Sequence, residues 1–76
     1  MYTIRQTQSF QGWLDRLTDR RAQIRIVARL RQAEAGNLGD WKSVSGHVSE
    51  MRVDVGPEYR LYFIRRGSVM IVLLAG

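Results

Sequence analysis

The sequence of 76 residues has no cysteine, one histidine, one lysine and one proline. The absence of cysteine excludes a disulfide scaffold, a thiolate metal site and a cysteine nucleophile, and the single histidine, His47, excludes a paired-histidine ribonuclease. No apolar run approaches the roughly 18 residues of a membrane span, and the first residues lack the apolar region of a signal peptide. Because 45% of the residues are hydrophobic, the chain is too apolar for a disordered tail. We expect one small, soluble, cytoplasmic domain over residues 1–76.

The charge is strongly basic and is carried almost entirely by arginine. Eleven of the twelve basic residues are arginine, Lys42 is the exception, and the formal net charge is +5. Arginine suits bidentate contacts with phosphate and stacking on bases. The composition therefore favours an anionic partner, either RNA, DNA or an acidic protein. The alternative is that a helix simply presents a solvated arginine face.

The first half of the chain predicts a strand followed by two helices. Residues 2–5 are β-prone and predict an edge strand, after which apolar residues recur at helical spacing. The two stripes are Phe10, Trp13, Leu14 and Leu17, and Ala22, Ile26, Val27, Leu30 and Ala33. Thr7 or Ser9 is expected to cap the first helix, Thr18 or Asp19 the second, and Gly36-Asn37 to end it. Six arginines are expected on the solvent side: Arg16, Arg20, Arg21, Arg25, Arg29 and Arg31.

After residues 38–41, which are expected to form a loop, apolar and polar residues alternate as in strands. A hairpin closed by Gly56-Pro57-Glu58 keeps its apolar residues on one face, and a second hairpin is expected to turn at Arg66-Gly67. The expected pairs are Val55–Tyr59, Val53–Leu61, Met51–Phe63, Asp54–Arg60, Arg52–Tyr62, Phe63–Met70, Leu61–Val72 and Tyr59–Leu74. The sequence thus predicts an α+β fold: an N-terminal strand, a two-helix hairpin and a three-stranded antiparallel sheet.

The last strand, residues 69–74, is apolar on both faces, which is typical of a central strand or one covered on both sides. The sequence ends at Gly76, directly after this strand. We therefore expect a chain truncated at its C-terminus.

Three segments share a recognisable pattern and together cover nearly the whole chain. They are FQGWLDRLTDRRAQIRIVARLRQAEAGNLGDWKSV, SEMRVDVGPEYRLYF and VMIVLLAG, of which the block GPEYRLYF is the most specific. They resemble the RelE/ParE toxin superfamily, and in particular its HigB-like, phage-derived addiction module killer group. That group has W-L-x-x-L, G-N-x-G-D-x-K and E-x-R-x-x-x-G-P-x-Y-R-x-Y-F. The resemblance implies a RelE-like β-α-α-β-β-β fold.

The resemblance also implies the toxin of a type II toxin–antitoxin pair. Many members are ribosome-dependent, metal-independent endoribonucleases that cut mRNA and inhibit translation, whereas the ParE branch poisons DNA gyrase. A third alternative is an inactive truncated toxin that only binds antitoxin or RNA. The implied partners are a cognate antitoxin, the ribosome and mRNA, with no cofactor and no membrane. The toxin can assemble with itself or with the antitoxin.

An RNase that uses the 2′-hydroxyl of RNA as nucleophile needs cations around the scissile phosphate and groups that accept and donate a proton. The expected polar sheet face and the loop before it offer Lys42, Arg52 and Arg60 as cations. Arg60 matches the Arg of the Y-R-x-Y motif, which lies at the scissile phosphate in nuclease members. The candidate proton carriers are Asp40, His47, Glu50 and Tyr62. The candidate RNA-binding residues are Tyr62, Arg65 and Arg66.

Each candidate also has a structural interpretation. Arg60 can form a cross-strand ion pair with Asp54, and Glu50 can pair with Arg52. Asp40 follows a glycine and can be a turn residue, and His47 can be an ordinary loop residue.

Overall fold

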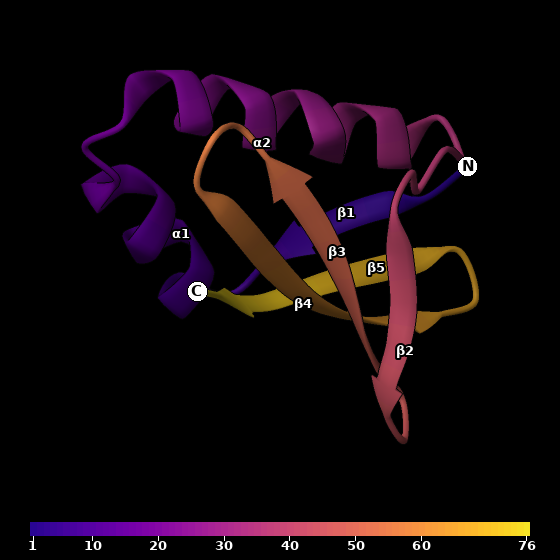
Figure 1. Ribbon diagram of the computed structural model, residues 1–76. Coiled ribbons are helices and arrows are strands. Elements are labelled where there is room, and N and C mark those ends of the chain that lie inside the picture. The colour runs from indigo at the N-terminus through magenta and orange to yellow at the C-terminus, as the bar shows by residue number, and fades with distance from the viewer.

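The chain folds into two helices that pack on one side of a five-stranded mixed sheet, in a computed structural model that describes residues 1–76 (Figure 1). The elements are β1 (Thr3–Gln6), α1 (Gln8–Arg16), α2 (Arg20–Glu34), β2 (Trp41–Ser45), β3 (Val48–Asp54), β4 (Glu58–Arg66) and β5 (Val69–Ala75). The strand order is β1-β5-β4-β3-β2. The strand β1 runs parallel to β5 and all other pairs are antiparallel. The α+β class is confirmed, but the expected three-stranded sheet is wrong because β1 and β2 extend it to five strands.

Both helices begin where the sequence predicts. Thr7 Oγ1 accepts a hydrogen bond from the Phe10 backbone N–H (3.1 Å), and Asp19 Oδ1 accepts one from Ala22 (3.2 Å). The Thr7 hydroxyl also donates to the Leu73 carbonyl oxygen (2.5 Å), which ties the start of α1 to β5. Gly36, with φ +98°, follows the end of α2. These residues fix where each helix begins and where α2 ends.

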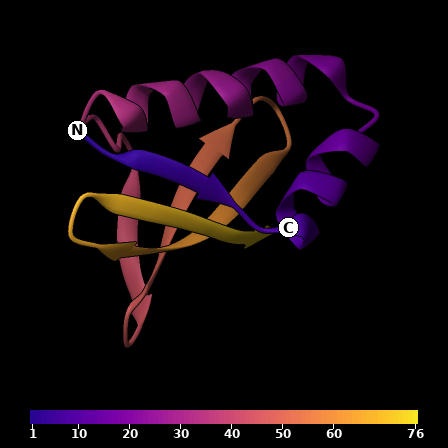
Figure 2. The same ribbon diagram turned by 180° about the vertical axis from the view of Figure 1, so that it is seen from behind.

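The core lies between the helices and one face of the sheet, and the two views of the ribbon show no helix on the opposite face (Figures 1 and 2). Its members are Phe10, Leu14, Ile26, Leu30, Ala33, Leu38, Met51, Val53, Leu61, Phe63, Met70 and Val72. Neither helix is long and apolar enough to cross a membrane. The face of the sheet away from the helices, which we call the open face, is available for polar side chains.

The strand β2 is missing from the sequence-based prediction, which treated its first residue as part of a loop. All five of its residues are exposed, so there is no alternation of buried and exposed positions to reveal a strand. It pairs only with β3 and forms one edge of the sheet. Lys42 is therefore on a strand, opposite Glu50.

The pairing of β3 with β4 is displaced by two residues from the expected register, although the predicted faces are correct. Val53 pairs with Tyr59, Met51 with Leu61, Arg52 with Arg60, Glu50 with Tyr62 and Asp54 with Glu58. The turn between β3 and β4 is centred one residue earlier than expected, at Gly56, which has φ +104°. Asp54 Oδ1 accepts a hydrogen bond from the Gly56 N–H (3.1 Å), a local interaction typical of aspartate in turns.

The pairing of β4 with β5 also differs from the prediction. The turn is at Gly67-Ser68, because Arg66 pairs with Val69, and Gly67 takes the positive φ (+57°) that the first position of such a turn requires. The other pairs include Phe63–Val72, Tyr62–Leu74 and Leu61–Ala75, with a bulge after Val72. The strand β5 lies between β1 and β4, as expected for a strand that is apolar on both faces.

Candidate functional site

Five predicted site residues meet on the open face of the sheet. The register places Lys42 opposite Glu50, Glu50 opposite Tyr62, and Arg52 opposite Arg60. Because side chains alternate between the two faces of a strand, all five lie on the face away from Met51, Val53, Leu61 and Phe63. We call these residues, Lys42, Glu50, Arg52, Arg60 and Tyr62, the open-face cluster.

Glu50 is at the centre of the open-face cluster and is its buried member. Its side chain is 4% exposed, its Oε1 is 3.7 Å from Lys42 Nζ, and its Oε2 is 3.9 Å from Arg60 Nη1. The expected pairing of Glu50 with Arg52 is wrong. Oε1 accepts no hydrogen bond although it is buried, and most buried carboxylate oxygens do accept one. Oε1 therefore keeps a free lone pair beside Lys42, but neighbouring side chains cover it, so a substrate reaches this oxygen only when those side chains move.

Arg60 is held by two carboxylates. Its Nη2 donates to Glu58 Oε2 at 3.2 Å, and its Nε to the same oxygen at 3.4 Å. The expected partner, Asp54, is wrong, because Asp54 caps the turn before β4. The hydrogen bond to Glu58, followed by the attraction of Glu50, raises the pKa of Arg60 above its ordinary value. Arg60 therefore stays charged at neutral pH and can stabilise negative charge but cannot exchange a proton.

Arg52 and Asp40 form a pair at the border of the open-face cluster. Arg52 Nη2 is 3.1 Å from Asp40 Oδ2, and Arg52 Nη1 is 3.9 Å from Glu58 Oε1. The Arg52 backbone N–H donates to the Asp40 carbonyl oxygen (2.9 Å). Asp40 is thus joined to Arg52 through both backbone and side chain, which fits the structural interpretation better than a proton acceptor.

His47, Arg65 and Arg66 lie outside the open-face cluster. His47 is at the tip of the β2–β3 hairpin, next to Gly46. Arg65 is on the helix side of the sheet, where its guanidinium lies over the Trp41 ring. Arg66 lies on the same face of β4 as Tyr62, but it is at the exposed end of the strand. The structure therefore separates the predicted site residues into two groups.

Arg29 is a positioning residue that the sequence analysis missed, because it was expected on the solvent side of α2. It is partly buried and donates to the Arg52 carbonyl oxygen (2.6 Å) and the Leu38 carbonyl oxygen (3.0 Å). Burial lowers the pKa of Arg29 below its ordinary value. The sequence feature that could have revealed its partial burial is its position directly before Leu30, at the border of the buried stripe of α2.

Comparison with known proteins shows relatives of undescribed activity. No family model matches the chain. An uncharacterized protein of Haemophilus influenzae is 40% identical over 73 residues, which are 96% of this chain and 74% of that protein. The solution structure of a conserved hypothetical protein of Helicobacter pylori has a TM-score of 0.66 at 17% identity, and covers all of this chain and 93% of that one. This second likeness establishes a shared fold.

Proposed function

The chain belongs to one family with the Haemophilus influenzae protein, and we propose that it is the toxin of a type II toxin–antitoxin pair, with a RelE-like fold, that cuts mRNA on the ribosome. The motif resemblance supports the toxin class. The observation that supports nuclease activity is the open-face cluster, in which Lys42 and Arg60 flank the buried carboxylate of Glu50, and Arg52 and Tyr62 lie on the same face. Such a protein acts in the cytoplasm, where its target is.

The chemistry follows from the positions of the side chains. In-line attack of the 2′-oxygen on phosphorus forms a cyclic phosphate, breaks the bond to the 5′-oxygen and adds negative charge to the phosphoryl oxygens. Arg60, Arg52 and Lys42 are the cations that offset this charge. Glu50 Oε1, once the side chains that cover it move aside, accepts the proton of the 2′-hydroxyl, and the phenol of Tyr62, opposite Glu50 in the register, donates one to the leaving 5′-oxygen. The reaction then needs no metal ion.

The test is translation of a defined mRNA in a cell-free system, with new 5′ ends mapped on the RNA. Cuts in phase with the codons that depend on active ribosomes support the proposal. For the variant Arg60→Gln, the matched control is Arg21→Gln, because it removes the same charge from an exposed position of α2. Gyrase-dependent DNA breaks without mRNA cuts would contradict the nuclease activity.

One observation favours a second candidate, a gyrase-inhibiting toxin of the ParE type. Each cation of the open-face cluster already has a carboxylate within 4 Å: Lys42 has Glu50, Arg52 has Asp40, and Arg60 has Glu58. Cations that are paired in this way can have a purely structural role, and a gyrase-inhibiting toxin needs no catalytic acid–base residues. Supercoiling by purified gyrase in the presence of the protein separates this candidate from the nuclease.

The proposed function includes a cognate antitoxin as partner. The exposed arginines of α2 and a mainly apolar hollow between α1 and α2 offer both kinds of contact. The apolar residues that line this hollow are Leu14, Ile24 and Val27. A segment with acidic and apolar residues is complementary to this surface.

A further inference from the structure

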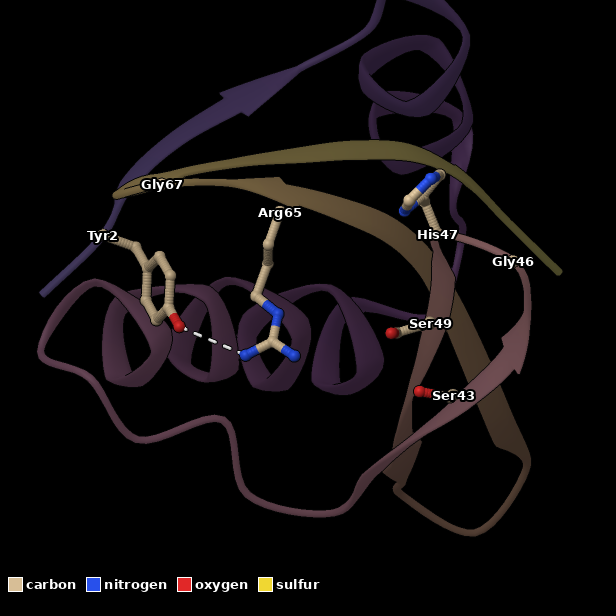
Figure 3. Close-up of a pocket in the computed structure, with 7 residues that line it drawn as sticks. All are labelled: Tyr2, Ser43, Gly46, His47, Ser49, Arg65 and Gly67. Carbon is tan, nitrogen blue, oxygen red and sulfur yellow. Dashed lines mark hydrogen bonds between the residues drawn. The ribbon is translucent and has the colours of Figure 1, made fainter.

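A polar hollow lies on the other side of the sheet from the open-face cluster. It has a volume of about 340 Å³ and is formed where the N-terminal residues, the β2–β3 hairpin and the β4–β5 turn meet (Figure 3). The side chains that line it are those of Tyr2, Ser43, His47, Ser49 and Arg65. We call it the Arg65 pocket. It contains hydroxyl groups, a guanidinium and an imidazole, but no carboxylate.

Arg65 is exposed and contacts two uncharged neighbours at this pocket. Its Nη1 donates to the Tyr2 hydroxyl (3.2 Å), and its Cζ lies 4.5 Å from the centroid of the Trp41 ring. No carboxylate lies within 4 Å of its guanidinium nitrogens, unlike those of Arg52 and Arg60. A positioned guanidinium with free N–H donors and no counter-ion attracts an anion.

The strand pairing places two hydroxyl groups in the wall of the same pocket. Ser43 and Ser49 are opposite each other in the β2–β3 register, and Figure 3 shows both hydroxyl oxygens turned toward Arg65. The pairing shifts between Ser43 and Ser45, and such an irregularity redirects a strand. It leads the chain to the hairpin tip, where His47 lies at the edge of the pocket.

We propose that the Arg65 pocket binds a phosphate group of RNA, at a site separate from the open-face cluster. Serine hydroxyls and a planar guanidinium match the oxygens of a phosphate. The volume is at the small end of the roughly 300–1,000 Å³ of ligand sites, and the walls are polar, so they suit a charged group rather than an apolar ligand. RNA as the source of the phosphate rests on the proposed function, whereas phosphate binding itself does not.

The test is an NMR titration that follows the His47 ring signals in every protein and the Arg65 Nε–H signal in those proteins that keep Arg65. The three ligands are inorganic phosphate, adenosine 5′-monophosphate and a short RNA without terminal phosphates. We expect saturable shifts, with the affinity reduced on the order of tenfold in Arg65→Gln, because a hydrogen bond to a charged group is lost. Arg21→Gln, at the far end of α2, should bind like the wild type. Dispersed amide spectra of both variants establish that they are folded.

The outcomes distinguish the source of the phosphate. Binding of the short RNA supports a phosphodiester of the strand, whereas binding of the mononucleotide alone assigns the pocket to a terminal phosphate. Equal affinities in Arg65→Gln and the wild type, or equal losses in Arg65→Gln and Arg21→Gln, overturn the proposal. Arg60→Gln should keep the His47 and Arg65 shifts even if no mRNA cutting is ever found. Loss of those shifts in Arg60→Gln would show that the two sites are not separate.

Discussion

Arg60 is the residue at which the nuclease and structural interpretations separate most clearly. If its guanidinium stabilises charge on the scissile phosphate, Arg60→Gln should lower the cutting rate on the order of 10²–10³-fold, which is typical of losing one preorganised donor. Arg60→Lys should restore the rate only in part, because lysine keeps the charge but loses the planar fork. Single-turnover cleavage on programmed ribosomes measures both, and circular dichroism checks the fold. Normal cutting by folded Arg60→Gln would remove the open face from the mechanism.

Glu50 gives the second prediction at this scale. Glu50→Gln keeps the shape of the side chain but removes its ability to take a proton, so cutting should fall on the order of 10²–10⁴-fold. The free energy of unfolding should change by less than about 1 kcal/mol, because Lys42 and Arg60 are both exposed enough to be hydrated once the carboxylate charge is gone. Urea denaturation measures the stability. A large loss of stability with normal cutting would instead make Glu50 a structural ion-pair residue.

The contact between α2 and the loop before β2 depends on a glycine. Gly39 has φ +64°, and a Cβ built there would lie 2.7 Å from Arg29 Nη2. Gly39→Ala should therefore displace the Arg29 side chain, which holds the Leu38 and Arg52 carbonyl oxygens, and should cost about 1–3 kcal/mol. Thermal and urea unfolding measure this loss. Gly46→Ala is the control, since Gly46 also has a positive φ but no atom within 4 Å of the built Cβ. Equal losses in both variants would assign the whole effect to the backbone.

The elements show which sequence signals suffice and which do not. The helices and the inward faces of β3 and β4 could be predicted, because Phe10, Ile26, Val53 and Leu61 lie at regular spacings and are buried. The strand β2 could not, because an edge strand with all residues exposed has no hydrophobic period. The register failed by two residues because side-chain alternation is preserved by any even shift. Only the local turn at Gly56 and the bulge in β5 decide between such alternatives.

The sequence could predict which candidate residues share a face of the sheet, but not which of them contact each other. Alternation along β3 and β4 brings Glu50, Arg52, Arg60 and Tyr62 to one face, so an error of two residues in the register left these four together. Lys42 joins them through β2, which the sequence did not reveal. The partners within the set could not be predicted, because Glu50–Arg60 and Arg60–Glu58 follow from the actual register and from side-chain conformations. The separation of Arg65 from this set follows from the alternation of β4, in which Arg65 shares a face with Leu61 and Phe63. The position of His47 depends on β2, the strand that the sequence did not reveal.

At the scale of the whole molecule, charge predicts how the protein meets its target. The net charge of +5 is spread over both faces of the sheet and the exposed side of α2, so no single residue should dominate association. Binding to purified ribosomes should weaken by about tenfold or more between about 50 and about 200 mM salt, because binding cations releases counter-ions from the RNA. Sedimentation with ribosomes at several salt concentrations measures this dependence. Arg60→Gln should bind nearly as well as the wild type while cutting poorly, since it removes one of twelve cations. An affinity independent of salt would indicate an apolar interface and would contradict RNA as the target.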